Sequence, residues 1–333
     1  MHTLRVDPRR PAPDAIAQAA ELLKRGGLVA FPTETVYGLG AHALDPAAVA
    51  RIFTAKGRPS YNPLIVHLAE AGGAPRLAGT WPEVAERLAA TFWPGPLTLV
   101  VPRASVVPDA VTAGLPSVAL RVPAHPVAHA LLREAGIPVA APSANRSTQI
   151  SPTTAAHVER SLGDRVDLIL DGGPTPVGIE STVVSLTGGV PTILRPGSLS
   201  IDELRAVVGE VAVASAEPRG TAARPSPGML DRHYAPRAEV RLFDSAERAE
   251  ALRLAEELGR QGRQVGVLTL GPAVLAPDVV EMPRDARLYS ARLYAVLHEL
   301  DDRGCDPILI ERVPDAPEWD GVRDRLHRAA HSG

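Results

Sequence analysis

The chain has 333 residues, of which 45% are hydrophobic and 22% are charged, and these proportions are typical of a globular protein. Its length predicts about two domains. A formal net charge of −3 at pH 7 argues against a protein that total charge holds to nucleic acid or to an anionic membrane. The single cysteine, Cys305, excludes a disulfide framework and a cysteine-based zinc cluster. We interpret it as a structural thiol in a reducing compartment.

No segment of the sequence predicts export or insertion into a membrane. The first ten residues, MHTLRVDPRR, carry charge but precede no apolar core of a signal peptide. No run of about 18 or more apolar residues occurs, so we expect no membrane-spanning helix. We therefore predict a cytoplasmic protein.

The first 200 residues are predicted to alternate helices with short apolar strands. Asp45 and Pro46 provide an N-cap and a first-turn proline for the second helix. The predicted helices cover residues 14–25, 46–56, 82–93, 126–135 and 153–162. The predicted strands cover residues 28–32, 63–68, 97–101, 117–122, 137–142, 168–173, 181–186 and 192–197. This pattern predicts a mixed α/β domain with a large sheet of parallel and antiparallel strands.

A second domain is predicted after a break in the pattern. Residues 210–228 are small, proline-rich and aperiodic, which indicates a linker. Strands are predicted at 238–243, 264–270, 279–283 and 307–313, with helices ending near 261, covering 285–303 and beginning at 320. This alternation predicts a small parallel-sheet domain of Rossmann type. We therefore expect a main domain at 10–208, a linker or lid at 209–238 and a C-terminal domain at 239–333.

The common short motifs of nucleotide, metal and acyl-transfer chemistry are absent from the sequence. It contains no Walker A segment, no HExxH, no CxxC and no GxSxG. The segment GLGAHA at 38–43 begins like a dinucleotide-binding fingerprint but lacks the third glycine, so we discount it. Any site must therefore be sought in other polar residues.

Basic and short polar side chains gather at the ends of the predicted strands. Arg58, Arg121 and Arg195, together with Lys56, are predicted to form a cationic cleft. The accompanying hydroxyl and amide side chains are Thr35, Asn62, Ser143, Asn145, Ser147, Ser151 and Ser181. Positive charge beside short hydrogen-bonding groups suits a polyanionic ligand.

Each of these residues taken alone also has a plainer interpretation. Ser, Thr and Asn after a strand commonly cap a turn or the next helix. Arg121 is open to pairing with a buried carboxylate, and His67 to being a hydrogen-bonded histidine within its strand. Lys56 stands where a cation favours the helix macrodipole, but arginine would serve equally in a chain with only two lysines. The conjunction of these residues favours a binding site.

Several segments in order resemble the threonylcarbamoyl-AMP synthase family, which has the YrdC-like fold. They are PTETVYGLG at 32–40, KGRPSYNPLIVH at 56–67, WPGPLTLV at 93–100, APSAN at 141–145 and GIESTVV at 178–184. The segment SPGMLDRHYAP at 226–236 resembles the linker of the family's long, two-domain form. The resemblance implies an α/β fold with a mixed, twisted YrdC-like sheet and helices, plus a small C-terminal Rossmann-like α/β domain.

The resemblance also implies an activity. Members of the family make L-threonylcarbamoyl-adenylate from L-threonine, bicarbonate or CO2, and ATP, and they release pyrophosphate. A tRNA-modifying transferase complex then receives the product and modifies adenosine 37 of tRNAs. The threonine amine captures CO2 as a carbamate, whose oxygen attacks the α-phosphorus of ATP. Such a reaction needs positioning and electrostatic stabilisation, with no protein nucleophile.

Matching positions to the family assigns one set of residues to ATP and another to threonine. The implied ATP contacts are Lys56 and Arg58, which are also the catalytic candidates, with Asn62, Ser117, Ser143, Asn145, Ser151, Arg195 and Tyr234. The implied threonine contacts are Thr35, His67, Arg121, the backbone of Ala141, and Ser181. Arg121 would clamp the carboxylate, while His67 and a hydroxyl would recognise the threonine side chain. Tyr234 would reach back from the linker, which would make the linker a lid. Mg2+ is expected with ATP, held mostly by phosphate and water, so no protein ligand is assigned to it.

Two other functions compete with this interpretation. An RNA-binding or ribosome-associated module would use the same fold, but the charge of −3 and an aromatic content of 4% disfavour it. A carbamoyl-phosphate-dependent carbamoyltransferase maturation domain usually carries zinc fingers, which one cysteine cannot build. We therefore expect neither high-affinity nucleic-acid binding nor a membrane partner.

Overall fold

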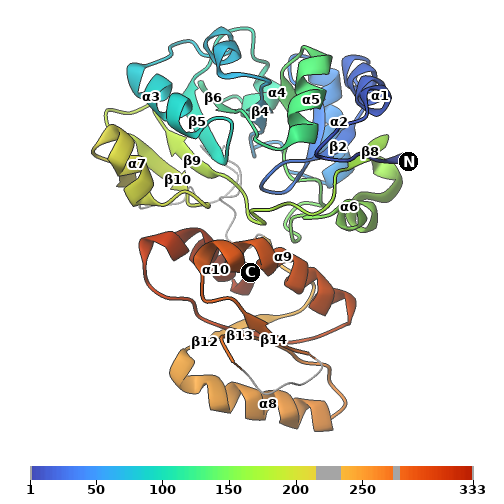
Figure 1. Cartoon of the computed structure of the whole chain (residues 1–333), viewed down its shortest axis with the longest axis vertical. Coiled ribbons are helices and arrows are strands. Elements are labelled where there is room, and N and C mark those ends of the chain that lie inside the picture. The colour runs from blue at the N-terminus through green and yellow to red at the C-terminus, as the bar shows by residue number, and fades with distance from the viewer. Residues whose placement is uncertain (1, 215–233, 273–277, 332–333) are drawn as a thin grey trace.

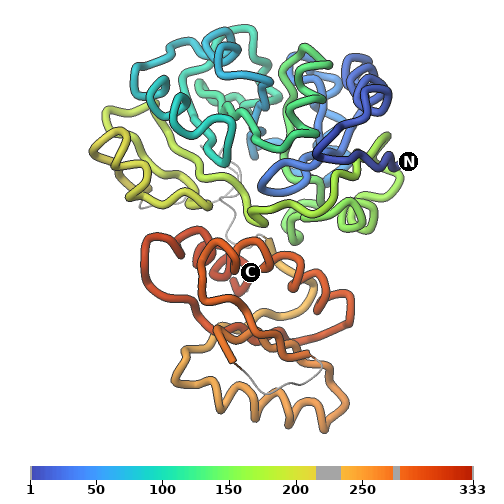
Figure 2. Tube along the Cα trace, viewed as in Figure 1, coloured from blue at the N-terminus to red at the C-terminus, as the bar shows by residue number. Residues whose placement is uncertain are grey.

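The computed structural model describes residues 2–214, 234–272 and 278–331. The described chain forms two bodies stacked along the long axis of the molecule (Figure 1), and the Cα trace in Figure 2 shows the same arrangement. We call residues 2–214 the N-terminal domain and the described residues from 238 onward the C-terminal domain. Within these described ranges, no helix is long and apolar enough to cross a membrane.

The N-terminal domain is built on an 11-stranded sheet with the order β1-β8-β2-β3-β7-β4-β6-β5-β9-β10-β11. Parallel pairs such as β4–β6 occur beside antiparallel pairs such as β5–β6, which confirms the predicted mixed sheet. The strands are β1 (His2–Arg5), β2 (Val29–Pro32), β3 (Tyr37–His42), β4 (Ile65–His67), β5 (Leu97–Pro102), β6 (Ser117–Arg121), β7 (Val139–Ala140), β8 (Leu168–Asp171), β9 (Thr182–Ser185), β10 (Thr192–Arg195) and β11 (Ala212–Val213).

Helices cover this sheet, and their ends follow the capping signals in the sequence. The Asp45 side chain accepts a hydrogen bond of 2.9 Å from Ala47 N at the start of α2, and Gly57 ends that helix with a φ of 60°. Lys56 therefore occupies the last turn of α2. The helices are α1 (Pro13–Lys24), α2 (Pro46–Lys56), α3 (Glu83–Phe92), α4 (Asp109–Thr112), α5 (Pro126–Ala135), α6 (Ala155–Leu162) and α7 (Ile201–Val208), with 3-10 turns at Ala71–Arg76 and Gly163–Arg165.

Strand β3 was not predicted, because its sequence YGLGAH contains two glycines, which weaken strand propensity. A Cβ on Gly40 would lie 2.8 Å from the Phe31 ring and 2.9 Å from Val139, so only glycine allows this close packing. Strands β1 and β11 and helices α4 and α7 were also not predicted. These four elements are short, so they carry little periodic pattern, and they lie at the edges of the domain or between its strands.

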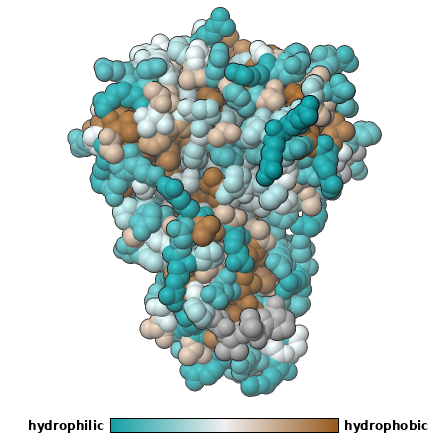
Figure 3. Space-filling model, in the orientation of Figure 1, coloured by the Kyte–Doolittle hydropathy of each residue, from teal (hydrophilic) through white to brown (hydrophobic). Residues whose placement is uncertain are grey.

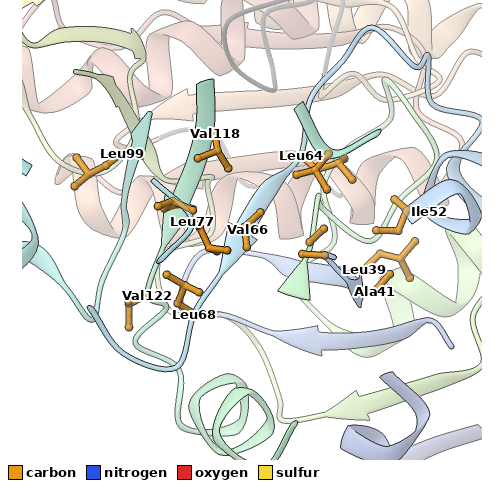
Figure 4. Close-up of a cluster of buried hydrophobic side chains, with 14 of the residues drawn as sticks. Leu39, Ala41, Ile52, Leu64, Val66, Leu68, Leu77, Leu99, Val118 and Val122 are labelled. Carbon is orange, nitrogen blue, oxygen red and sulfur yellow. The ribbon is translucent and has the colours of Figure 1, made fainter. Parts of the chain in front are cut away.

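A continuous core lies between the central strands and the helices that cover them. It includes Leu39 and Ala41 from β3, Ile52 from α2 and Val66 from β4, all of them fully buried. Figure 4 shows these side chains converging with Leu64, Leu68, Leu77, Leu99, Val118 and Val122. Burial of a single such side chain stabilises the fold by about 1.5–3 kcal/mol, so this core holds the strand ends in place.

The C-terminal domain is a four-stranded parallel sheet with the order β12-β15-β13-β14. This confirms the predicted small parallel-sheet domain. Helices α9 and α10 lie between its sheet and the N-terminal domain, and α8 covers the opposite face (Figure 1). The elements are β12 (Val240–Phe243), α8 (Arg248–Arg260), β13 (Gly266–Leu270), β14 (Val279–Met282), α9 (Ala286–Asp302), β15 (Ile308–Glu311) and α10 (Asp320–Ala330), with 3-10 turns at Ser245–Glu247 and Pro317–Trp319.

The edges of the large sheet extend past the predicted domain limits. Strand β1 precedes residue 10, and β11 follows residue 208 within the predicted linker, yet both belong to the 11-stranded sheet. Most of the predicted linker, at 215–233, lies outside the described residues. The division at 10–208, 209–238 and 239–333 stays a prediction.

Over both domains, the face in Figure 3 has hydrophobic residues in separate areas among hydrophilic ones.

Candidate active site

A small cavity lies where several strand ends and Tyr234 meet. Its free volume of about 40 Å³ is little more than one water occupies in the liquid. The residues that line it are Thr33, Thr35, Val36, Gly38, Arg58, Ile65, His67, Arg121, Ala141, Pro142, Ser143, Glu180, Ser181, Arg195 and Tyr234. Most of the residues predicted for the site are therefore brought to one place.

Four other predicted residues stand directly behind this wall. Lys56 contacts the carbonyl oxygen of Ser143, and Asn145 accepts from the same ammonium group. The carbonyl oxygen of Asn62 accepts from Arg58 Nε at 3.1 Å. Ser151 donates its hydroxyl to Glu180. Lys56, Asn62 and Ser151 are each hydrogen-bonded to a residue of the lining, and Asn145 is connected to the lining through Lys56.

Ser117 is the predicted residue that the structure does not bring to the cavity. It begins β6, whereas Arg121 ends the same strand. Four residues of a strand span about 13 Å, so the two side chains lie at opposite ends of β6. Ser117 instead pairs with Pro102 of β5.

Lys56 is buried, with 3% of its surface exposed, and its ammonium group braces the APSAN segment. Nζ donates to Ser143 O at 2.5 Å, to the carbonyl oxygen of Asn145, and to Asn145 Oδ1 at 3.4 Å. Three acceptors for three protons leave no place for the planar fork of arginine. Burial, followed by the charge of Arg58, holds the pKa of Lys56 well below its usual range, while Glu180 opposes that shift. This enclosure accounts for a lysine here better than the helix macrodipole does.

Arg58 presents a second cation to the cavity. Its Nε donates to Asn62 O at 3.1 Å, and its Nη2 donates to Pro63 O at 2.8 Å, which fixes the guanidinium plane. Burial lowers the pKa of Arg58 to about 10, with Tyr234 opposing and Arg195 reinforcing the shift, so the group stays charged at neutral pH.

The Asn62 side chain is fully buried, and neither of its amide atoms has a hydrogen-bond partner among the described residues. Buried amides are rarely left in this state, because desolvation without a partner costs about 1–3 kcal/mol. The predicted role of Asn62 in ligand binding gives a reason for this otherwise unexplained amide.

Arg121 forms a buried ion pair, as one of the plainer interpretations anticipated. Its Nη2 donates to Glu34 Oε1 at 2.8 Å and to Thr35 Oγ1 at 3.0 Å, and its Nε donates to Gly95 O at 3.2 Å. Glu34 Oε2 accepts from Ala124 N at 3.0 Å. No hydrogen bond joins Arg121 Nη1 to any other part of the chain that the structure describes. The pair thus orients the guanidinium while leaving one nitrogen for a ligand.

His67 faces the same cavity in its neutral form. Burial and the neighbouring charge of Arg121 lower its pKa to about 3. His67 Nδ1 is buried without a hydrogen-bond partner in the described ranges. A histidine whose hydrogen bonds were satisfied within its strand would not have this free nitrogen.

Arg195 and Ser181 connect the two predicted halves of the site. Arg195 Nη2 donates to Ser181 O at 2.9 Å and to Ser181 Oγ at 3.1 Å. Ser181 Oγ also shares a hydrogen bond of 2.8 Å with Thr98 Oγ1. On its other side, Arg195 Nη1 donates to Tyr234 Oη at 3.4 Å.

Tyr234 covers the cavity and contacts the C-terminal domain. Its side chain is 1% exposed, and its φ of 58° is unusual for a residue other than glycine. The ring stacks on Tyr294 with centroids 6.0 Å apart, and Arg325 Cζ lies 4.8 Å from the ring centroid. Burial, followed by the negative charge of Glu180, raises the pKa of the Tyr234 hydroxyl.

Two carboxylates of the site were not predicted, although both lie in motifs quoted for the resemblance. Glu34 stands in PTETVYGLG, and Glu180 stands in GIESTVV. The only feature that could have indicated them in advance is that a buried arginine near each carboxylate needs a counter-charge. For Glu180 that arginine is Arg325, which lies 145 residues away in sequence and in the other domain. Within the described parts of the chain, no cluster of three or more His, Cys, Asp or Glu side chains could hold a metal ion.

Known proteins resemble this chain over nearly its whole length. A family model for Sua5, YciO and YrdC proteins, described as telomere recombination, matches residues 21–197. A second model, described as the threonylcarbamoyl-AMP synthase C-terminal domain, matches residues 199–331. Both domains therefore have a counterpart among known families.

Individual relatives agree with these matches. The threonylcarbamoyl-AMP synthase of Bacillus subtilis is 45% identical over 322 residues, which cover 95% of this chain and 92% of that protein. That of Pyrococcus abyssi is 44% identical over 317 residues, covering 94% and 93%. The crystal structure of P. abyssi Sua5 complexed with L-threonine has a TM-score of 0.92 at 41% identity, covering 99% of this chain and 98% of that one. The chain therefore belongs to the threonylcarbamoyl-AMP synthase family.

Proposed function

We infer that this chain is a threonylcarbamoyl-AMP synthase, which forms L-threonylcarbamoyl-adenylate and pyrophosphate from L-threonine, bicarbonate or CO2, and ATP. The observation that carries the inference is the cavity in which Arg58 and Arg195 face Arg121 and neutral His67. One side of this cavity suits an amino acid, and the other suits a polyphosphate. The likeness of the whole chain to synthases of the same name supports the assignment.

On the amino-acid side, Arg121 would bind the carboxylate of threonine through Nη1, because Glu34 and Thr35 already engage Nη2. Neutral His67 would hydrogen-bond the threonine hydroxyl through its free Nδ1. Such a site rejects valine, since valine would leave the buried imidazole nitrogen unpaired. The backbone of Ala141 and the hydroxyl of Ser181 would complete the contacts.

On the nucleotide side, Arg58 and Arg195 would bind the phosphate oxygens, and Lys56 would fix the APSAN segment beside them. The threonine nitrogen bonds to the carbon of CO2 and loses a proton, which forms a carbamate. A carbamate oxygen then bonds to the α-phosphorus, and the bond from that phosphorus to pyrophosphate breaks. Fixed cations lower the barrier because negative charge increases on the phosphoryl oxygens and the leaving group. Mg2+ bound with ATP would neutralise further phosphate charge, and phosphate and water would be its ligands.

The cavity in its present form would have to open before ATP enters. A volume of about 40 Å³ is too small for a nucleotide, and Tyr234 contributes to its wall next to the C-terminal domain. Movement of Tyr234 away from Arg195 would widen the site on the nucleotide side. The lid predicted at 209–238 is described here only at its two ends.

The product would serve tRNA modification, because threonylcarbamoyl-adenylate is an activated acyl donor from which a transferase complex would move the threonylcarbamoyl group to adenosine 37, with AMP as the leaving group. Direct tight binding of RNA is not part of this proposal, since the chain carries a net charge of −3. An RNA-binding module would instead show strong binding that weakens steeply with salt.

The test is the release of pyrophosphate from ATP by the purified full chain with Mg2+. We expect release to require both L-threonine and bicarbonate, and L-valine to replace L-threonine poorly. Mass spectrometry should identify threonylcarbamoyl-AMP as the product. Release that continues unchanged without threonine would contradict the proposal.

A further inference from the structure

The carboxylate of Glu180 lies on the cavity wall but is held largely by the C-terminal domain. Glu180 is 6% exposed, and its Oε1 accepts the hydroxyl of Ser151. Its Oε2 accepts from Arg325 Nε at 2.8 Å and from Tyr294 Oη at 3.0 Å. Arg325 belongs to α10 and Tyr294 to α9, so both helices that face the N-terminal domain contact this one group.

Arg325 is itself fully buried and fixed in orientation. Its Nη1 donates to Pro196 O at 2.9 Å and to Asp324 Oδ2 at 2.6 Å. Asp324 in turn pairs with Arg328 at 2.9 Å. The contact between the domains thus brings together two carboxylates and two guanidinium groups, of which Glu180, Arg325 and Arg328 are buried.

Two glycines, one on each domain, allow the domains to pack closely in one relative position around Glu180. A Cβ on Gly178 would lie 2.3 Å from Ser290 O in α9. A Cβ on Gly321 in α10 would lie 2.3 Å from Gly197 O. Backbone therefore touches backbone at both places, and the position of Arg325 relative to Glu180 is set by the fold.

The negative charge of Glu180 needs a nearby positive charge, because it otherwise weakens the effect of the site's cations on an anionic ligand. Glu180 raises the pKa of Lys56, and against the effect of burial Arg325, followed by Arg195, lowers the pKa of Glu180. Glu180 is therefore ionised, and without Arg325 a full negative charge would face an incoming polyphosphate. At an effective dielectric of about 20, one charge about 10 Å away changes affinity by roughly tenfold.

We propose that Arg325 is a charge-compensating residue of the nucleotide side, through which the C-terminal domain cancels the Glu180 carboxylate. Lys56, Arg58 and Arg195 then act on the polyphosphate without opposition from Glu180. The Glu180 carboxylate binds the C-terminal domain, and the positive charge of Arg325 prevents that carboxylate from repelling ATP. This inference rests on the proposed function, because it takes ATP as the ligand.

The experiment measures the Kd of Mg-ATP and, separately, that of L-threonine by titration calorimetry on the full chain. Arg325→Met should weaken ATP binding about tenfold and change threonine binding less than about twofold. The double variant Glu180→Gln with Arg325→Met should regain ATP affinity to within about threefold of the wild type. Arg323→Met is the matched control on α10, since Arg323 pairs with Asp315 and Asp320 and not with Glu180.

Thermal unfolding is recorded for every variant, because Arg325→Met leaves a buried carboxylate without its partner. If that variant does not fold, Glu180→Gln alone decides the question. It keeps the shape of the side chain and removes one negative charge, so that Asp324 alone faces both Arg325 and Arg328 and the variant should bind ATP more tightly.

Three results would overturn the inference while leaving the proposed function intact. They are wild-type ATP affinity in folded Arg325→Met, no recovery in the double variant, and unchanged or weaker ATP binding by Glu180→Gln. Absence of ATP binding by the wild type would instead refute the proposed function itself.

Discussion

Replacement of Lys56 by arginine tests whether the shape of an ammonium group is required at this position. The substitution keeps the charge but places a longer, planar group in a site where Lys56 is 3% exposed. Its Nζ is enclosed by the carbonyl oxygens of Ser143 and Asn145 and by Asn145 Oδ1. A guanidinium cannot reproduce this arrangement without moving the APSAN segment.

The expected loss of stability follows from these contacts. Overpacking a buried site costs about 1–3 kcal/mol, and each weakened hydrogen bond to a charged group adds about 1.5–3 kcal/mol. These contributions are not additive, so we expect a total near 3 kcal/mol, or a decrease in Tm of roughly 6–12 °C. Displacement of Ser143 and Asn145 should lower kcat/KM for pyrophosphate release by at least about 100-fold.

Lys24→Arg is the matched control, because Lys24 is the chain's other lysine and lies exposed at the end of α1. Its Tm and activity should equal those of the wild type. The reasoning would be refuted if Lys56→Arg stayed within about 1 °C and twofold of the wild type. A large loss of activity at unchanged Tm would show that Lys56 acts on the ligand and does not brace the segment.

Two further predictions concern buried groups that lack hydrogen-bond partners among the described residues. Asn62→Ala should leave Tm within about 2 °C, because the amide forms no hydrogen bond with the described part of the chain, yet it should raise the KM for ATP about tenfold; an unchanged KM would exclude Asn62 from the nucleotide site. His67 has a pKa near 3 in the folded protein and an ordinary value of 6.5, so the unfolded chain binds one more proton between these limits, and stability rises with pH across that window. Chemical denaturation of His67→Asn from pH 4 to 6 should therefore show a dependence about 1.4 kcal/mol per pH unit shallower than that of the wild type; equal slopes would contradict a neutral, buried His67.

The sequence predicted most of the fold because its helices and strands carry clear local signals. Helix α2 begins at a capping aspartate and ends at a glycine with positive φ, and both signals are visible in the sequence. Strand β3 was missed because Gly38 and Gly40 are needed for close packing against Phe31 of the preceding strand and against Val139 and Ala141, which lie about 100 residues away in the chain. Local propensity cannot anticipate a strand whose composition is set by its neighbours in space.

The features of the site also differ in whether they depend on the local sequence or on residues far away in the chain. The cations of the cleft could be recognised because arginine and lysine within apolar strands or at strand ends are uncommon. Their orientation could not be predicted, since Arg121 depends on Glu34 and Glu180 depends on Arg325. The C-terminal domain, for which no ligand was predicted, thus reaches the site through Tyr294 and through Arg325, which lies 145 residues from Glu180 in sequence.

The two buried carboxylates explain how a site for anions tolerates acidic residues in its wall. Glu34 orients the fork of Arg121 and leaves Nη1 for a ligand, so the pair is neutral overall and still offers a directed donor. Glu180 is neutralised by Arg325, which is buried beside it and also donates to Pro196 O. Arg121 compensates its carboxylate within the N-terminal domain, whereas Arg325 does so across the domain contact. Separation of the domains would therefore leave the amino-acid side balanced and make the nucleotide side more negative, so loss of that contact should impair ATP binding before threonine binding.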